Sequence, residues 1–515
     1  RDVGLKFLPI FFLLIFFYFF PNMTVISNNK TSKLFLFSFI IVLLSAIGFR
    51  LFKATHSGML FDELFSIFQY SENLKTVFTL YDAPNNHILN SFILHFTARI
   101  FNFSEYYPRI HAVVFSIIYS VGMFVIIRKI FTHNIIALSA LLVLLFNIYI
   151  FDLSILARGY TIALAVIAVE IYLALRFIDN MDQQLSCQLV IKTAIVFSVL
   201  NFLAFAASFT SLVCLVAICF GLVVYLLING IKSKNYTAFF LFTGITVLLT
   251  GIFFAAILLP IFSQFAETVQ KSNISGNAWN EFTLYIGNLF SLFTGDFFIT
   301  NRHNSIIFFA LVVFLLFRFY LIRPGSASFS DKYSIFFLFF FLVYVFLLYI
   351  NLAVFRTYLG YPRNHVFLIP VFILAAFVLL ESMILWNSSK AFNAIISTIS
   401  IILMTGFIFR FPSTHVIEIS NWKYQSITKP LITDLMKLDK KRHWTIFYDS
   451  SFSYATYWFY TNYYNISTVT KDKLLHGYNS SVKITDIEKT TETNAAFKYD
   501  FYRQFGALVI INTNK

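Results

Sequence analysis

The sequence contains few charged residues, few cysteines, and little glycine or proline. Asp, Glu, Lys and Arg make up 12% of its 515 residues, whereas a soluble domain carries about 25%. Three cysteines cannot build a disulfide-rich secreted scaffold, and 17 glycines exclude a collagen repeat. The composition also excludes a disordered chain and a coiled coil, which both need many more polar or charged residues.

Apolar and aromatic residues are present in large excess. Hydrophobic residues account for 59% of the chain, the mean hydropathy is +0.77, and phenylalanine alone contributes 69 residues. A soluble globule of this size could not bury so much apolar surface. The sequence therefore predicts a polytopic α-helical membrane protein.

Apolar runs long enough to cross a bilayer recur along the first 410 residues. A transmembrane helix needs about 20 mostly apolar residues. We expect about eleven spans, near 35–52, 110–127, 134–152, 160–176, 190–207, 211–229, 238–259, 305–322, 333–351, 364–381 and 391–409. The segment 5–21 is also apolar and would be a twelfth span or a signal-like stretch. We interpret residues 1–22 as a dispensable segment, either non-native or an extra apolar stretch, because Met23 opens a plausible N-terminus.

Lysine and arginine in the short loops orient these spans by the positive-inside rule. The loops 128–133, 176–190, 229–237, 317–332 and 386–390 carry most of the loop cations and are expected to be cytoplasmic. The two long loops, 53–108 and 260–304, and the segment after the last span then lie outside. The same loop cations explain much of the net charge of +14, and no nucleic-acid-binding motif is present.

The last 105 residues differ in composition from the rest. Residues 411–515 hold 22 of the 62 charged side chains, and helix-like and strand-like stretches alternate there. We expect a membrane domain over 23–410 and a small extracytoplasmic α/β domain over 411–515. Its Tyr and Trp residues either stack on sugar rings or pack against the membrane domain. It has no Gly-rich loop for a nucleotide sugar.

An acidic pair, Asp62-Glu63, opens the first long outer loop. Neighbouring helical residues point in different directions, so one carboxylate can face a cavity while the other pairs with a cation. The exposed one could act as a general base or bind a metal. The alternative is an acid pair that only stabilises a helix N-terminus.

Four stretches follow one another between residues 61 and 177: "FDELFS", "NNHILNSFILHF", "YYPRIHAVVFSIIYSVGMFVIIRKIF" and "LSILARGYTIALAVIAVEIYLALRF". This set resembles the bacterial GT-C glycosyltransferases, specifically the family-39-like enzymes related to protein O-mannosyltransferases and aminoarabinose transferases. The resemblance covers residues 55–180 well and continues loosely to about 410. It departs at "NNH", where Ile88 replaces a proline that often follows the histidine.

The resemblance implies a GT-C fold and an enzyme of the bacterial inner membrane and cell envelope. Such enzymes move a hexose or pentose from a polyprenyl-phosphate carrier to a polysaccharide, lipid or protein acceptor at the outer face, usually with inversion. Asp62 would then be the catalytic base and Glu63 its partner. Some members use a divalent metal and others do not, so the resemblance leaves the metal requirement open; no other cofactor is implied.

Three arginines at the expected outer face are candidates for binding the donor phosphate. Arg158 lies in "ARGY", and Arg356 and Arg363 lie in "FRTYLGYPRNH". A guanidinium stays charged and matches phosphate with a planar fork. The alternative is an arginine that only reaches toward the interface or forms an ion pair. Candidate substrate-binding residues beside these positions are Asn86, His87, Tyr160 and His365.

Two further features have open roles. Glu170 lies inside a predicted span, where carboxyl groups are costly; we expect it to pair within the helical bundle. The loop 260–304 could recognise the acceptor or act as a lid. The three cysteines show no metal-ligand spacing and are expected to be small core residues. A glycosyltransferase is thus the leading hypothesis, with a transporter or flippase of lipid-linked or polymeric sugar, or a non-catalytic scaffold, as alternatives.

Overall fold

The computed structural model describes most of the membrane domain and parts of the tail. The described residues are 30–81, 86–100, 107–181, 186–271, 282–283, 329–355, 366–386 and 389–409, and in the tail 429, 446–448, 482–486, 498–499 and 507–511. The expected span at 305–322, residues 1–22, and most of the loop 260–304 lie outside this set.

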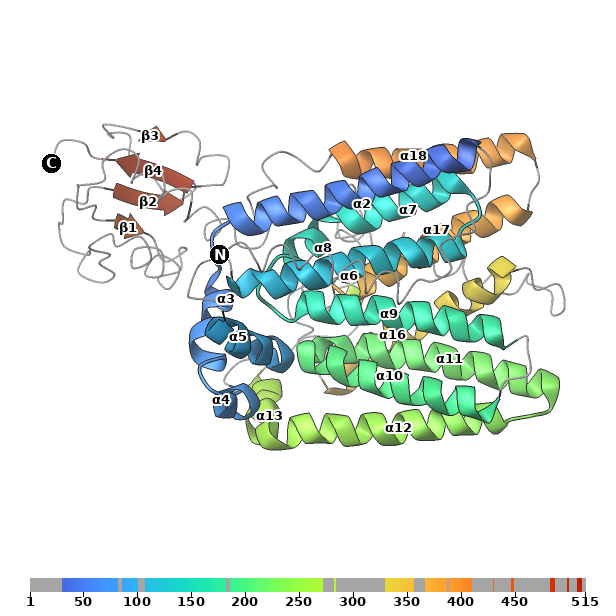
Figure 1. The fold of residues 1–515 in the computed structure, drawn as a ribbon, viewed down its shortest axis with the longest axis horizontal. Coiled ribbons are helices and arrows are strands. Elements are labelled where there is room, and N and C mark those ends of the chain that lie inside the picture. Colours follow the sequence, from blue (N-terminus) through green and yellow to red (C-terminus); the bar gives the residue numbers. More distant parts are fainter. Residues whose placement is uncertain are drawn as a thin grey trace.

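Long helices packed side by side form the body of the molecule (Figure 1). They are α2 (Lys30–His56), α6 (Tyr107–Ile130), α7 (Asn134–Phe146), α9 (Tyr160–Asn180), α10 (Cys187–Ala207), α11 (Leu212–Ser233), α12 (Thr237–Leu258), α16 (Phe329–Phe355), α17 (Leu368–Trp386) and α18 (Lys390–Phe409). One continuous apolar core runs between them. At Gly122 the absence of a side chain lets α6 approach α9 closely, since a Cβ there would lie 3.1 Å from the Cβ of Ala168.

Six stretches of the described helices are long and apolar enough to cross a membrane: Leu34–His56, Pro108–Ile130, Tyr160–Asn180, Cys187–Ala207, Phe209–Ile231 and Thr237–Gln264. The chain is therefore a multi-pass membrane protein. Four other expected spans coincide with shorter apolar helices, within α7, α16, α17 and α18. The total of eleven spans stays a prediction.

The expected span at 134–152 is interrupted at Asn147. The backbone there leaves the helical region, with φ −58° and ψ 121°, and the Asn147 side chain accepts a hydrogen bond from the N–H of Ile150. This is the geometry of an N-cap. It ends α7 and starts the short helix α8 (Ile148–Leu153), which leads directly into the loop that carries Arg158.

At one end of the bundle, polar side chains hold neighbouring helices together. Asp179 of α9 pairs with Lys129 of α6 and accepts a hydrogen bond of 2.7 Å from the Tyr333 hydroxyl of α16. Glu381 of α17 accepts from the backbone N–H groups of Thr132 and His133, just before α7. These contacts fix the helix ends at this end of the bundle, which the sequence predicts to be the cytoplasmic one.

The opposite end carries the short helices of the first long loop. The stretch from Phe61 to Thr79 is not one helix but three pieces: α3 (Phe61–Phe65), the π-helix η1 (Ser66–Tyr70) and α4 (Leu74–Thr79). The break has a local cause, because the Asn73 side chain accepts from the Thr76 N–H and starts α4 anew. Later in the same loop, the chain forms one helix, α5 (Ile88–Ile100).

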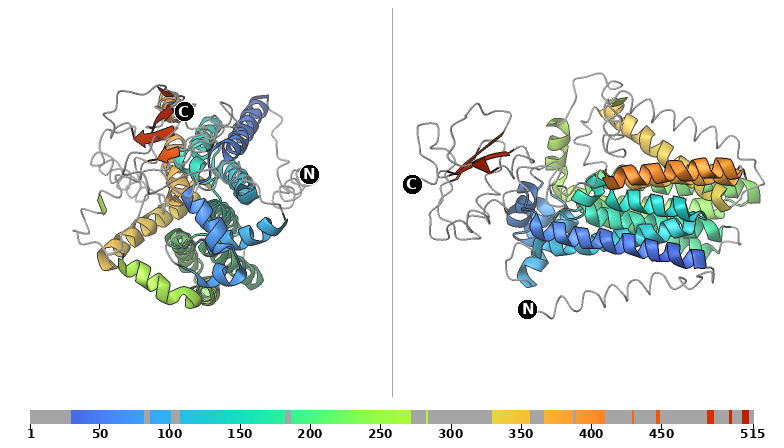
Figure 2. Two further views of the ribbon diagram at one scale, coloured as in Figure 1. Left: turned by 90° about the vertical axis from the view of Figure 1, so that its left-hand side faces the viewer. Right: turned by 90° about the horizontal axis from the view of Figure 1, so that it is seen from above.

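A glutamine side chain of the second long loop contacts the backbone of the first. The amide of Gln264, on α13 (Phe262–Lys271), accepts from the Tyr81 N–H at 2.5 Å and donates to the Thr79 carbonyl at 3.0 Å. The side-chain amide thus pairs with the backbone on either side of Leu80, as a neighbouring strand would. Figure 2 shows α13 standing beside the first-loop helices at this end.

The described part of the tail contains a four-stranded sheet. Its order is β1 (Ile446–Tyr448), β2 (Val482–Asp486), β4 (Ala507–Ile511) and β3 (Lys498–Tyr499). β1 and β2 are parallel and the other pairs antiparallel. Strands β1 and β4 fall in segments expected to be strands, while the expected tail helices lie outside the described residues. The sheet lies at the bundle end that carries α3, α4 and α5 (Figures 1 and 2).

This arrangement predicts a labelling pattern in intact cells. Cys187 is exposed at the start of α10, whereas the exposed Lys75 of α4 lies at the opposite end of the bundle. A Lys75→Cys variant should react with a membrane-impermeant maleimide before permeabilisation, and the native Cys187 only afterwards. Labelling of Cys187 in intact cells with protection of Lys75→Cys would reverse the orientation and contradict an extracytoplasmic tail.

Candidate active site

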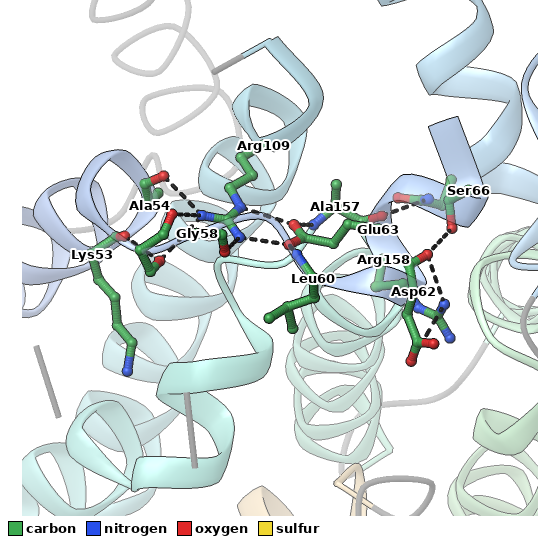
Figure 3. A network of polar contacts seen from close by, with 12 residues as sticks. Lys53, Ala54, Gly58, Leu60, Asp62, Glu63, Ser66, Arg109, Ala157 and Arg158 are labelled. Carbon is green, nitrogen blue, oxygen red and sulfur yellow. Dashed lines mark hydrogen bonds and ion pairs between the residues drawn. The ribbon is translucent and has the colours of Figure 1, made fainter. Parts of the chain in front are cut away.

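The acidic pair begins a helix whose two carboxylates have different surroundings. Glu63 is fully buried, and its side chain is held by four hydrogen bonds. Arg109 donates through Nε and Nη2 at 2.8 and 2.5 Å, and the N–H groups of Leu60 and Ala157 donate at 2.9 and 2.8 Å. The carboxylate of Glu63 is therefore fully occupied within the protein and is not available to substrate (Figure 3).

Arg109 joins three segments around this carboxylate. It is the third residue of α6 and follows Pro108, which suits the first turn of a helix. A cation is disfavoured at a helix N-terminus, so the pairing with Glu63 accounts for its position. Its remaining N–H groups donate to the carbonyls of Ala54, Ser57 and Gly58 at 2.8–3.1 Å. The guanidinium thus fixes the chain between α2 and α3.

Asp62 faces a different partner. Its side chain is 13% exposed, and its Oδ2 lies 3.9 Å from Nη1 of Arg158, whose side chain is 2% exposed. The same Nη1 donates to the Asp62 backbone carbonyl at 3.2 Å. The expected division between the two acids is therefore present in the structure: Glu63 is a buried structural partner, and Asp62 is the carboxylate near a second arginine and near solvent (Figure 3).

The loop that carries Arg158 is attached to α2 by two buried cations. Lys53 pairs with Asp152 at 2.5 Å, and Nε of Arg50 donates to the Ser154 hydroxyl at 2.8 Å. Both cations also lie over the ring of Phe151, Arg50 at 4.9 Å and Lys53 at 5.4 Å from its centre. These contacts fix the start of the loop, so that Arg158 is presented from a rigid support.

The end of the loop packs against α10 without room for a side chain at Gly159. A Cβ on Gly159 would lie 1.6 Å from the Ala207 carbonyl oxygen and 2.9 Å from Nδ1 of His87. His87 contacts the same carbonyl at 2.8 Å, and its ring lies edge-on to Tyr160. Glycine is thus required here by close backbone approach.

An aromatic ring lies beside Arg158, and further buried groups lie near that ring. The Tyr160 ring lies 5.8 Å from its guanidinium carbon. Tyr81 is buried nearby, and burial, together with Tyr70 and Tyr160, raises the pKa of its hydroxyl above the usual value. The hydroxyl therefore stays neutral at physiological pH. Asn86 is also buried.

Asn86 has a mainly local role in this neighbourhood. Its amide donates to the carbonyls of Val77 and Leu80 at 3.2 and 2.6 Å, and its carbonyl oxygen accepts from the Ser91 hydroxyl at 2.9 Å. These contacts link the end of α4 to the first turn of α5. A substrate contact by Asn86 stays a prediction.

The structure brings together Asp62, Glu63, His87, Arg158 and Tyr160 from the predicted site. Arg356, Arg363 and His365 lie outside the described residues, so their roles as phosphate or substrate ligands stay predictions. Sequence reasoning did not single out Arg109. Its signal was present as a lone cation in the first turn of an apolar span, directly after a proline.

The described residues also test the predictions made for Glu170 and for the cysteines. Glu170 is fully buried, but neither of its carboxyl oxygens has a hydrogen-bond partner among the described residues, so the expected pairing within the bundle is not found there. The three cysteines are free thiols; Cys214 is buried as expected, whereas Cys187 is exposed and is not a core residue. Within the described ranges no three His, Cys, Asp or Glu side chains gather as a metal-binding set.

Comparison with solved structures finds a weak similarity. ArnT from Cupriavidus metallidurans, solved with bound undecaprenyl phosphate, is 12% identical to the chain, with 95% of this chain and 99% of that chain covered and a TM-score of 0.45. Similarity of this degree carries no argument about which residues act. No protein-family model matches the chain, and no curated protein matches it significantly.

The buried pair predicts that substitution of Glu63 lowers the stability of the protein much more than substitution of Asp62. Glu63→Ala leaves the Arg109 guanidinium buried without its counter-charge, and breaking a buried pair this way costs about 3–5 kcal/mol. Thermal unfolding of the purified protein in detergent should shift strongly downward. Asp62→Asn is the matched control, because its carboxylate is partly exposed, and it should unfold near the parent temperature. Equal unfolding temperatures for Glu63→Ala and the parent would contradict the structural role.

The close approach at Gly159 predicts a position-specific effect of one methyl group. Gly159→Ala must push the loop away from Ala207, so the yield of monodisperse protein and its unfolding temperature should both fall. Gly48→Ala and Gly244→Ala are controls, since a Cβ at either position meets nothing within 4 Å. If Gly159→Ala behaves like these two variants, the loop does not pack against α10 as described.

Proposed function

We propose that the chain is an integral-membrane glycosyltransferase that moves a sugar from a polyprenyl-phosphate carrier to an acceptor at the outer face of the membrane. One observation carries the proposal. The partly exposed carboxylate of Asp62 lies beside the buried guanidinium of Arg158, at one end of a bundle of membrane helices. A base and a phosphate-binding cation are the two groups that such a transfer needs.

The chemistry assigned to these groups is a direct displacement. The acceptor hydroxyl attacks the anomeric carbon, and the bond from that carbon to the phosphate oxygen breaks. Asp62 takes the proton of the acceptor hydroxyl, and the polyprenyl phosphate leaves as an anion. Arg158 stabilises the charge that develops on the phosphate. Arg356 and Arg363 are proposed to act with it.

The surroundings of Arg158 suit an anionic lipid headgroup. A guanidinium remains charged even when buried, and a preorganised cation is most effective where water is excluded. The nearby Tyr160 and His87 are aromatic and buried, and a contact of either ring with the apolar face of a sugar is part of the proposal.

The identity of the base can be tested by substitution. Asp62→Asn keeps the size of the side chain but removes its proton acceptor, so transfer should fall by about 10²–10⁴-fold. The measurement is release of free polyprenyl phosphate from synthetic polyprenyl-phosphate hexoses and pentoses, with an envelope extract of the host as acceptor source. Binding of the donor by Asp62→Asn should remain close to that of the parent.

Two outcomes would contradict the proposal. Near-normal transfer by folded Asp62→Asn protein would eliminate this residue as the base. Movement of a fluorescent lipid-linked sugar across the bilayer of reconstituted vesicles, without any transfer by the parent protein, would instead favour the transporter or flippase.

A further inference from the structure

The backbone on the N-terminal side of Arg158 is held from two directions. The Ala157 N–H donates to Oε1 of Glu63 at 2.8 Å, and the Ala157 carbonyl accepts from Nδ2 of Asn90 at 3.0 Å. This carbonyl shares its peptide plane with the N–H of Arg158, which donates to the Leu156 carbonyl. The orientation of that plane sets the direction in which the Arg158 side chain leaves the loop.

The contacts of Asn90 determine the orientation of its amide. A carbonyl oxygen only accepts hydrogen bonds, so the NH₂ group of Asn90 must face Ala157. Its Oδ1 then faces Nε2 of His111 at 2.7 Å. Because this oxygen also only accepts, Nε2 of His111 must carry the hydrogen. His111 and Asn90 are both buried, so no exchange with bulk water replaces these bonds.

Both supports of Ala157 lead back to the first turns of α6. Arg109 acts on the Ala157 N–H through Glu63 of α3, and His111 acts on its carbonyl through Asn90 of α5. Residues two apart on a helix point about 200° from one another, which lets one helix reach two different elements. The first turns of α6 therefore hold both backbone groups of Ala157, its N–H and its carbonyl, directly before Arg158.

We infer that His111 is a positioning residue for the phosphate site. Its Nε2–H holds the Asn90 amide in one orientation, and this amide holds the peptide that aims Arg158 toward Asp62. Without the His111 donor, Oδ1 of Asn90 is buried without a hydrogen-bond partner. The Asn90 side chain then shifts to satisfy this oxygen, which weakens its bond to the Ala157 carbonyl and loosens the peptide. The inference rests on the proposed role of Arg158 in binding a lipid phosphate.

The test uses binding of undecaprenyl phosphate to the full-length protein in nanodiscs. His111→Phe keeps a ring of similar shape but loses the donor, and binding should weaken about 3- to 10-fold, as expected for one neutral hydrogen bond. His111→Gln places an NH₂ group near the same point and should restore most of the affinity. Asn90→Asp keeps the acceptor for His111 but loses the donor to Ala157, so it should bind as weakly as His111→Phe.

A double variant separates positioning from general destabilisation. In an Arg158→Ala background, His111→Phe should cause no further loss of binding, because the group that it positions is already absent. The same loss in both backgrounds, or parent-like binding by folded His111→Phe and Asn90→Asp, would overturn the inference. Parent-like binding by Arg158→Ala would instead count against the proposed function, so the two failures are distinguishable.

Discussion

The buried pair of Glu63 and Arg109 is the contact on which the rest of the site depends. It joins the end of α2, the start of α3, the first turn of α6 and the loop before α9, all through one carboxylate and one guanidinium. Charges taken out of water are costly unless their hydrogen-bonding groups are satisfied. Here the carboxylate accepts four bonds and all three guanidinium nitrogens donate, so the pair is a fully satisfied junction.

This junction explains why two adjacent acids differ so much. Consecutive helical residues project in different directions, and the direction of Glu63 is fixed by Arg109. Asp62 is thereby turned toward Arg158 and solvent. The loop of Arg158 is in turn fixed by Lys53, Arg50 and the close packing at Gly159. Rigid placement of this kind is what electrostatic stabilisation of a leaving phosphate requires.

Much of the membrane architecture follows from composition alone, because a 20-residue apolar run has few alternatives to a transmembrane helix. The boundaries of α2, α9, α10, α11 and α12 lie close to those expected. The predicted boundaries are wrong where a single capping side chain determines the backbone conformation. Asn147 separates α7 from α8 in this way, and Asn73 begins α4. Hydrophobic periodicity carries no information about such caps.

The site was predictable in part for a similar reason. The pair Asp62-Glu63 and Arg158 stand out as charges at the edges of apolar segments, and the different roles of the two acids follow from helical geometry. The partners Arg109, Asn90 and His111 could not be paired in advance, because each contact joins residues 21 to 94 positions apart. Only the packing of α3, α5 and α6 reveals them.

A cryo-electron microscopy structure of the protein in nanodiscs with undecaprenyl phosphate would show directly where the donor carrier binds. We expect the phosphate to contact the Arg158 guanidinium, the Asp62 carboxylate to lie beside it, and Glu63 to remain bound to Arg109. A phosphate bound at the opposite end of the bundle would contradict this expectation. So would a phosphate that binds Arg109 in place of Glu63 while Arg158 keeps its contact with Asp62.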